Sequence, residues 1–98
     1  MNAWSKAYGS KATKQKIYLG KVLNYYKKHS AAEILLETGN IQVNDHIMLQ
    51  GPTTGVIEQK VSSMQIDNKS IEKAKKGQRV GIKTNKTVRK NDKLFIVR

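Results

Sequence analysis

The segment "EKAKKGQRVGIKTNKTVRKNDKLF", residues 72–95, combines dense positive charge with the regular spacing of a packed strand. Val80 and Ile82 stand two residues apart, so on a β-strand both side chains point to the same face. Arg79 and Lys83 then point to the opposite face. The segment therefore predicts a strand that packs against a core on one side and displays charge on the other.

Short runs with similar alternation fill the chain from Ile17 onward, and turn residues separate them about every 8–12 residues. No long helical period appears. Six short strands with this spacing are typical of an antiparallel sandwich or barrel. The strands are predicted at residues 17–26, 31–37, 43–51, 56–67, 78–84 and 92–98. The side chains expected to be mostly buried are Val22, Ile34, Leu36, Ile47, Val61, Ile66, Val80 and Ile82.

Two local features modify this pattern of strands. Within residues 56–67 the alternation slips by one near Ser62 and Ser63, which is typical of a β-bulge. The following "NKSIEKAKKG" is too short for a stable isolated helix. We expect one short helical turn near residues 70–76, ended at Gly77.

The length of 98 residues corresponds to a single domain. Residues 1–16 are polar, basic and aperiodic, which indicates a flexible N-terminal arm before a β domain at residues 17–98. No apolar run approaches the roughly 18 residues that span a bilayer, and none resembles a secretory signal. The chain contains no cysteine, which excludes a disulfide framework and a thiolate zinc site. We expect a cytoplasmic monomer.

Positive charge is concentrated at the two ends of the sequence. The net charge is +12, and residues 1–28 hold seven lysines without an acid. Residues 29–68 hold one lysine and five acids, whereas residues 69–98 hold eleven basic residues and two acids. Charge that is both large and segregated is typical of a protein that contacts phosphates.

The order of several segments resembles a known family. "YLGKV", "VNDHI", "GPTTGVIEQKVSSMQID", "AKKGQRVGIK" and "NDKLFIV" are similar to the β-barrel of translational GTPases, the second domain of elongation factor Tu. The carboxy-terminal barrel of collagenase-like peptidases carries similar sequences. The resemblance covers residues 17–98, departs from the family's Val-Gly-Asp turn at Asn44, and implies a closed six-stranded antiparallel β-barrel of the translation-factor domain II type.

No constellation of catalytic residues is visible in the sequence. The Gly-x-x-x-x-Gly-Lys-Ser/Thr stretch of the GTPase domain does not occur. His29 and His46 stand in or beside predicted turns, at no metal-ligand spacing. We therefore expect no enzymatic activity, no metal and no cofactor.

The resemblance places the first and last strands side by side, which would join the two basic ends in one surface. Tyrosines are interleaved with the charge, and aromatic rings beside cations suit contact with bases or riboses. A merely solubilising role of the lysines is the alternative. The predicted nucleic-acid-binding residues are Lys21, Tyr25, Tyr26, Lys27, Lys28, Arg79, Lys83, Lys86, Arg89 and Lys90.

The main hypothesis is therefore a non-catalytic RNA- or ribosome-associated binding module, with rRNA or tRNA as the partner and no contact with membranes. The alternative hypothesis is a protein-docking subunit that supplies its barrel in trans to a peptidase-like or RNA-modifying enzyme. Such a subunit would use the acidic middle of the chain and exposed apolar residues such as Leu35.

Overall fold

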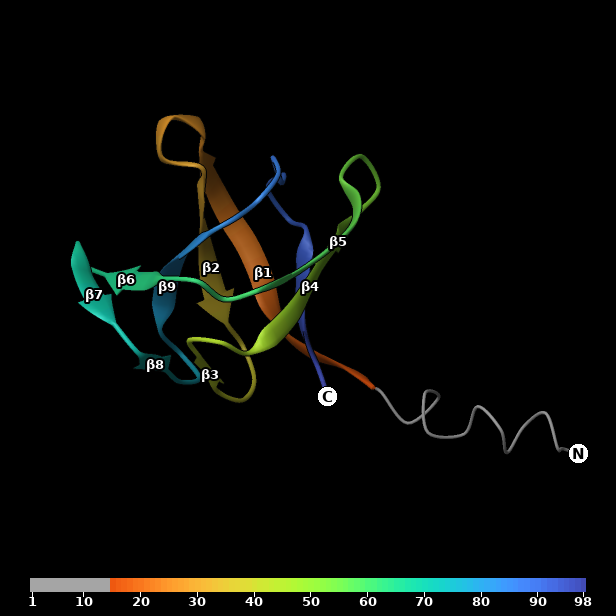
Figure 1. Cartoon of the computed structure of the whole chain (residues 1–98). Coiled ribbons are helices and arrows are strands. Elements are labelled where there is room, and N and C mark those ends of the chain that lie inside the picture. Colours follow the sequence, from red (N-terminus) through yellow and green to blue (C-terminus); the bar gives the residue numbers. More distant parts are fainter. Residues whose placement is uncertain (1–14) are drawn as a thin grey trace, which may run out of the picture.

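The computed structural model describes residues 15–98, which form an all-β domain (Figure 1). One short 3-10 turn, η1 (Lys27–His29), connects the first two strands. The strands are β1 (Lys16–Tyr26), β2 (Ala31–Leu36), β3 (Ile41–Gln42), β4 (His46–Gly51), β5 (Gly55–Lys60), β6 (Met64–Ile66), β7 (Lys69–Ile71), β8 (Lys73–Ala74), β9 (Arg79–Lys83) and β10 (Lys93–Val97).

Eight of these strands form one antiparallel sheet in the order β5-β4-β10-β1-β2-β9-β6-β7, and β3 pairs with β8 in a second, two-stranded sheet. The predicted closed six-stranded barrel is wrong, because β5 and β7 are the two edges of an open sheet. The physical reason lies at residues 61–63, where the predicted fourth strand breaks into β5 and β6. β5 pairs with β4 at one edge of the sheet, whereas β6 pairs with β9 near the opposite edge.

The predicted helical turn near residues 70–76 is also wrong. Asp67 and Asn68 both adopt positive φ, 51° and 64°. Two such residues make the tight turn that matches the twist of a β-hairpin. The chain therefore returns as β7, pairing Met64 with Ile71, and continues into β8, where Ala74 pairs with Ile41.

The inward parity does change near Ser62 and Ser63, but the predicted β-bulge is wrong, because the strand is interrupted at residues 61–63. Gln59, Val61 and Met64 are all buried, so the inward parity changes between the last two. Register shifts occur instead in β1, between Tyr18 and Gly20 and again between Val22 and Asn24. These irregularities bend the longest strand, which has 11 residues.

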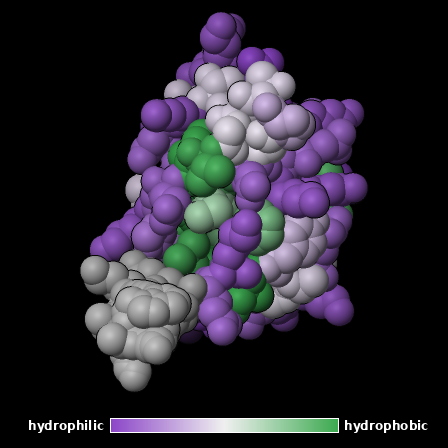
Figure 2. Space-filling view, turned by 90° about the vertical axis from the view of Figure 1, so that its right-hand side faces the viewer, coloured by the Kyte–Doolittle hydropathy of each residue, from purple (hydrophilic) through white to green (hydrophobic). Residues whose placement is uncertain are grey.

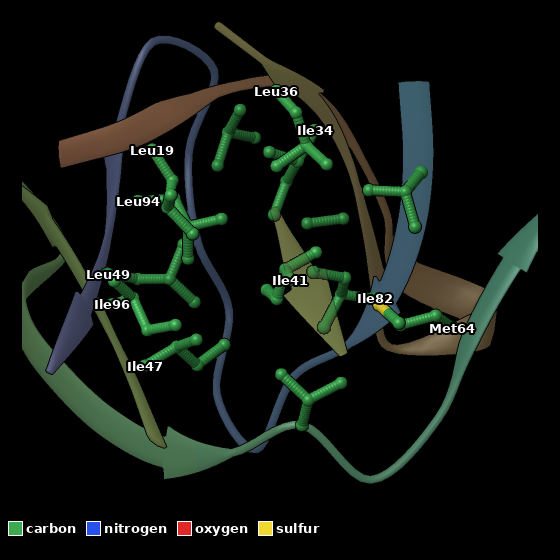
Figure 3. Close-up of a cluster of buried hydrophobic side chains, with 14 of the residues drawn as sticks. Leu19, Ile34, Leu36, Ile41, Ile47, Leu49, Met64, Ile82, Leu94 and Ile96 are labelled. Carbon is green, nitrogen blue, oxygen red and sulfur yellow. The ribbon is translucent and has the colours of Figure 1, made fainter. Parts of the chain in front are cut away.

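The core is a single cluster of aliphatic side chains enclosed by the curved sheet (Figure 3). Of the predicted core residues, Ile66 is half-buried and packs against this cluster, and all the others are buried. The core also includes residues that the sequence reading did not single out: Leu19, Ile41, Leu49, Val88, Leu94 and Ile96. Residues from both ends of the described chain thus share one core, as expected for a single domain.

The first described residues lie beside the last ones. The backbone N–H of Arg98 donates to the carbonyl of Gln15 over 2.9 Å, and β1 begins at Lys16. Residues 1–14 of the predicted arm lie outside the described residues, so the arm stays a prediction. No helix within residues 15–98 is both long and apolar enough to cross a membrane.

Candidate binding surfaces

The predicted neighbourhood of the first and last strands is confirmed, because β1 pairs with β10 along most of its first half. The segment of residues 84–91 connects β9 to β10 across one end of the sheet (Figure 1). Its Thr84 N–H donates to Ser30 O over 2.8 Å, and its Asn91 N–H donates to Val22 O over 2.8 Å. The basic end, as we call it, consists of the exposed residues Lys27, Lys28, Lys83, Lys86, Arg89 and Lys90.

The 84–91 loop, which carries three of these six charges, is held in place by buried polar side chains. The Gln59 amide donates to Lys83 O over 2.9 Å and accepts from the Asn85 N–H over 2.8 Å. The Asp92 carboxylate, 2% exposed, accepts from the Arg89 N–H over 2.9 Å and from the Thr54 hydroxyl. The charges therefore stand on a fixed backbone rather than on a loose loop.

Of the four remaining predicted site residues, Tyr25 turns toward the core, whereas Lys21, Tyr26 and Arg79 point outward. Tyr25 packs against the core, whereas Tyr26 is 48% exposed, so only Tyr26 of this pair is open to a partner. Tyr26 donates its hydroxyl to Glu33 over 3.3 Å, and this carboxylate raises the pKa of the phenol. Lys21 and Arg79 lie on the outward side of the sheet, both opposite Leu35. The structure thus divides the predicted residues between two places.

The second place is the outward side of the sheet, which we call the outer face. Its side chains alternate with those of the core along each strand. One cross-strand row, from β5 to β9, contains Val56, Gln50, Lys93, Lys21, Leu35 and Arg79. A neighbouring row contains Glu58, Met48, Phe95 and Tyr18.

The outer face carries a strip of hydrophobic surface on the side formed by β4, β5 and β10. Figure 2 shows this strip bordered by hydrophilic residues. Val56 is 58% exposed, and Met48, Phe95 and Val97 are half-buried. Exposed apolar groups that form a continuous patch with a polar border indicate a surface that contacts another molecule.

A groove of about 440 Å³ adjoins this strip, lined by Lys16, Gln50, Gly51, Pro52, Asn91, Lys93 and Phe95. The Lys16 ammonium lies 4.6 Å from the centroid of the Phe95 ring and donates to Gln50 Oε1 over 3.1 Å. Both contacts fix a side chain that is otherwise flexible. The groove thus combines an aromatic wall with a positioned cation.

Tyr18 supports the Phe95 ring from the neighbouring strand. The two rings meet edge to face, with centroids 5.8 Å apart at an angle of 72°. The Tyr18 hydroxyl donates to Glu37 over 2.7 Å. Burial and this carboxylate raise the pKa of Tyr18 to about 12. The tyrosine is therefore neutral at physiological pH and remains a hydrogen-bond donor.

The titratable residues singled out for possible chemistry do not converge. Within residues 15–98 no three His, Asp or Glu side chains are arranged to hold a metal ion. His46 Nε2 lies 3.1 Å from Glu58 Oε1 on the outer face, and His29 is exposed in η1. The expectations of no cofactor and no enzymatic activity stay predictions.

The cluster on the outer face was not predicted from the sequence. It consists of Lys16, Met48, Val56 and Phe95. The alternation of side chains along β10 could have indicated it: Leu94 and Ile96 point into the core, so Phe95 between them points outward. A large aromatic side chain usually lies in the core, so one that points outward indicates a candidate contact surface. Which strands lie beside it depends on pairings between distant segments.

No family model matches this chain. A protein named collagenase from Porphyromonas gingivalis is 44% identical over 97% of this chain and 23% of its own length. A protein of Methanocaldococcus jannaschii, named an uncharacterized protease, is 44% identical over 92% of this chain and 22% of its own length. The chain is homologous to one part of these proteases. It spans less than a quarter of either relative.

The fold has a match among solved structures. The C-terminal domain of a protein described as a U32 peptidase, from Geobacillus thermoleovorans, superposes with a TM-score of 0.75. The match covers 82% of this chain and 91% of that domain at 16% identity. The chain described here therefore shares the fold of that C-terminal domain.

These relationships correct the functional interpretation of the sequence. The description as a translation-factor-like, RNA-binding and ribosome-associated protein is wrong, because the homologues are proteases. The assignment to the second domain of elongation factor Tu is not supported, whereas the likeness to collagenase-like peptidases is. The "AKKGQRVGIK" pattern describes a glycine turn and an alternating strand, which many β domains share. A binding role of the basic end stays a prediction.

Proposed function

We propose that this chain is a non-catalytic β domain that docks onto the catalytic part of a collagenase-like protease, either within one chain or as a separate subunit. The observation that carries the proposal is the 44% identity over 97% of this chain to a 23% portion of a collagenase. A portion of that size beside a much larger remainder is the relation of an accessory domain to its enzyme.

The outer face is the docking surface in this proposal. Its aromatic pair, Tyr18 and Phe95, stands on two paired strands of the sheet. Val56, on β5 of the same face, is 58% exposed. Aromatic side chains supported by a rigid element are the residues that dominate protein interfaces. Docking would cover these apolar atoms and leave the basic end accessible at the end of the sheet.

The test is a chimera in which this chain replaces the homologous portion of the Porphyromonas gingivalis collagenase. We expect the chimera to unfold in one cooperative transition and to resist limited proteolysis at the junction, because the two parts pack together. Cleavage of collagen by the parent should be retained by the chimera.

Val56→Glu in the chimera should expose the junction to protease, because it places a charge in the apolar interface. Thr87→Glu, an exposed position of the 84–91 loop, is the matched control and should leave the junction protected. If the unmodified chimera is cleaved at the junction as rapidly as two unlinked domains would be, the proposal is wrong.

A further inference from the structure

The outer face contains a pair of like charges that the fold itself does not require. Lys21 on β1 stands directly opposite Lys93 on β10, and both point outward. Like charges in directly opposed positions of an antiparallel pair destabilise the sheet. Gln50 and Leu35 occupy the flanking positions of the same row, so neither neighbour neutralises the pair.

The carboxylates that the outer face carries are already engaged elsewhere. Glu58 Oε1 lies 3.1 Å from His46 Nε2, and no Lys or Arg side chain within residues 15–98 forms an ion pair with a carboxylate. Glu37 accepts the hydroxyl of Tyr18 over 2.7 Å, and Glu33 accepts from Asn24 over 3.2 Å and from Tyr26 over 3.3 Å. The lysines of this surface therefore have no anionic partner within the described part of the chain, and the face presents unneutralised ammonium groups beside an apolar strip.

The groove brings these charges to an aromatic anchor. Phe95, Pro52 and Lys93 line it, and Lys16 holds its ammonium over the Phe95 ring. A side chain seated beside Phe95 would lie close to the ammonium group of Lys16 and to Lys93, which lines the same groove. An occupant that matches this arrangement is apolar at its centre and anionic on both sides.

We propose that this groove binds an acidic, amphipathic segment of the protease's catalytic part, with an aliphatic or aromatic side chain on Phe95 and carboxylates beside Lys16, Lys21 and Lys93. The inference rests on the proposed function and gives the chemistry of the docking partner. The charge pattern disfavours a second copy of this chain as the occupant, because two copies with a net charge of +12 each repel one another.

The binding test uses the free chain, labelled with ¹⁵N, and a synthetic peptide of alternating glutamates with a central leucine and phenylalanine. We expect the peptide to shift the amide resonances of Lys16, Val56, Lys93 and Phe95. The affinity should fall as salt is added, since exposed charges are screened. A peptide with lysines in place of the glutamates should not bind, because only its charge differs.

A pair of double variants separates this groove from general charge. Lys21→Gln with Lys93→Gln should weaken peptide binding by about fivefold or more, which two exposed ion pairs account for. Lys83→Gln with Lys86→Gln removes the same charge from the basic end and should change the affinity less than about twofold. Both double variants should keep the spectrum of the folded chain.

Three results would overturn the inference. They are resonance shifts confined to the basic end, equal losses in the two double variants, or no shifts up to about 1 mM peptide. Because the titration needs no protease, its failure is distinct from failure of the chimera. A protected chimera junction with no peptide binding would leave the docking function in place and refute the acidic partner.

Discussion

At the scale of single residues, Gly20 is where the packing of β1 against β2 tolerates no side chain. A Cβ atom built on Gly20 would lie 1.9 Å from the carbonyl oxygen of Leu35, a backbone atom that cannot rotate away. Gly81, also in a central strand, has its nearest such neighbour, Gln65 O, at 3.7 Å. The two glycines therefore differ in sterics although both sit in strands.

Gly20→Ala should lower the free energy of unfolding by about 3 kcal/mol, because β1 and β2 must separate to accommodate the methyl group. Urea unfolding followed by circular dichroism measures this loss. Gly81→Ala is the matched control and should change stability by less than about 1 kcal/mol. Equal losses in the two variants would show that the close approach of Leu35 O does not determine the cost at Gly20.

Tyr18 links the outer face to pH. Its pKa of about 12 exceeds the ordinary value of 10.0, because burial and Glu37 disfavour the phenolate. A folded-state pKa above the unfolded one gives stability that is fully present below pH 10 and is lost as the pH rises through 12.

Ultraviolet absorbance during alkaline titration should reveal one tyrosine that ionises last, and Tyr18→Phe should remove that step. Glu37→Gln should shift the step to lower pH, because it removes the negative charge beside the phenol. Glu33→Gln, near Tyr26 instead, should leave the last step in place. A last step that persists in Tyr18→Phe would contradict the assignment.

At the scale of the elements, the 84–91 loop depends on one buried amide. Gln59 is 7% exposed and bridges β5 to the loop through hydrogen bonds to Lys83 and Asn85. Removing this amide leaves a carbonyl and an N–H without their partner in a buried setting, which costs more than the bonds themselves contribute.

Gln59→Leu should therefore destabilise the domain by about 2 kcal/mol and accelerate hydrogen exchange at the Asn85 amide. Native-state exchange detects both effects, globally and at the loop. Gln65→Leu, at an exposed position of β6, is the control and should leave the exchange of Asn85 unchanged. Unaltered exchange in Gln59→Leu would mean that Val88 and Asp92 suffice to hold the loop.

Much of the element pattern could be predicted from the sequence, and the pairing could not. Alternation in "VGI" and "EILL" places Val80, Ile82 and Ile34 inside, because burial with period two is a local property. The open sheet depends on whether the two halves of residues 55–66 share one partner strand, which is a long-range matter. Likewise, no residue near Lys21 in the sequence indicates that Lys93 stands opposite, so the groove could not be predicted from local patterns.

At the scale of the whole molecule, positive charge dominates the field. The net charge is +12, and within residues 15–98 no lysine or arginine forms an ion pair with a carboxylate to offset it. Mutual repulsion among like charges opposes the compact state, and salt relieves it. A change from about 0.01 M to about 0.3 M salt shortens the screening length from about 30 Å to less than 10 Å.

The melting temperature should therefore rise with sodium chloride over this range, by about 5 °C if the relief is about 1 kcal/mol for a domain of this size. Differential scanning calorimetry measures the change. Lys83→Gln with Lys86→Gln should melt higher at low salt and gain less from added salt. A melting temperature that falls with salt would mean that attractive pairs outweigh repulsion.

The adjacency of Gln15 and Arg98 also has a mechanical meaning. β1 and β10 are antiparallel and meet at these two residues, so a pull applied there separates the strands from one end. The hydrogen bonds between them lie across the strands and break one after another, instead of sharing the load together. The domain should thus unfold at low force when it is pulled at these two residues, because its hydrogen bonds break in sequence.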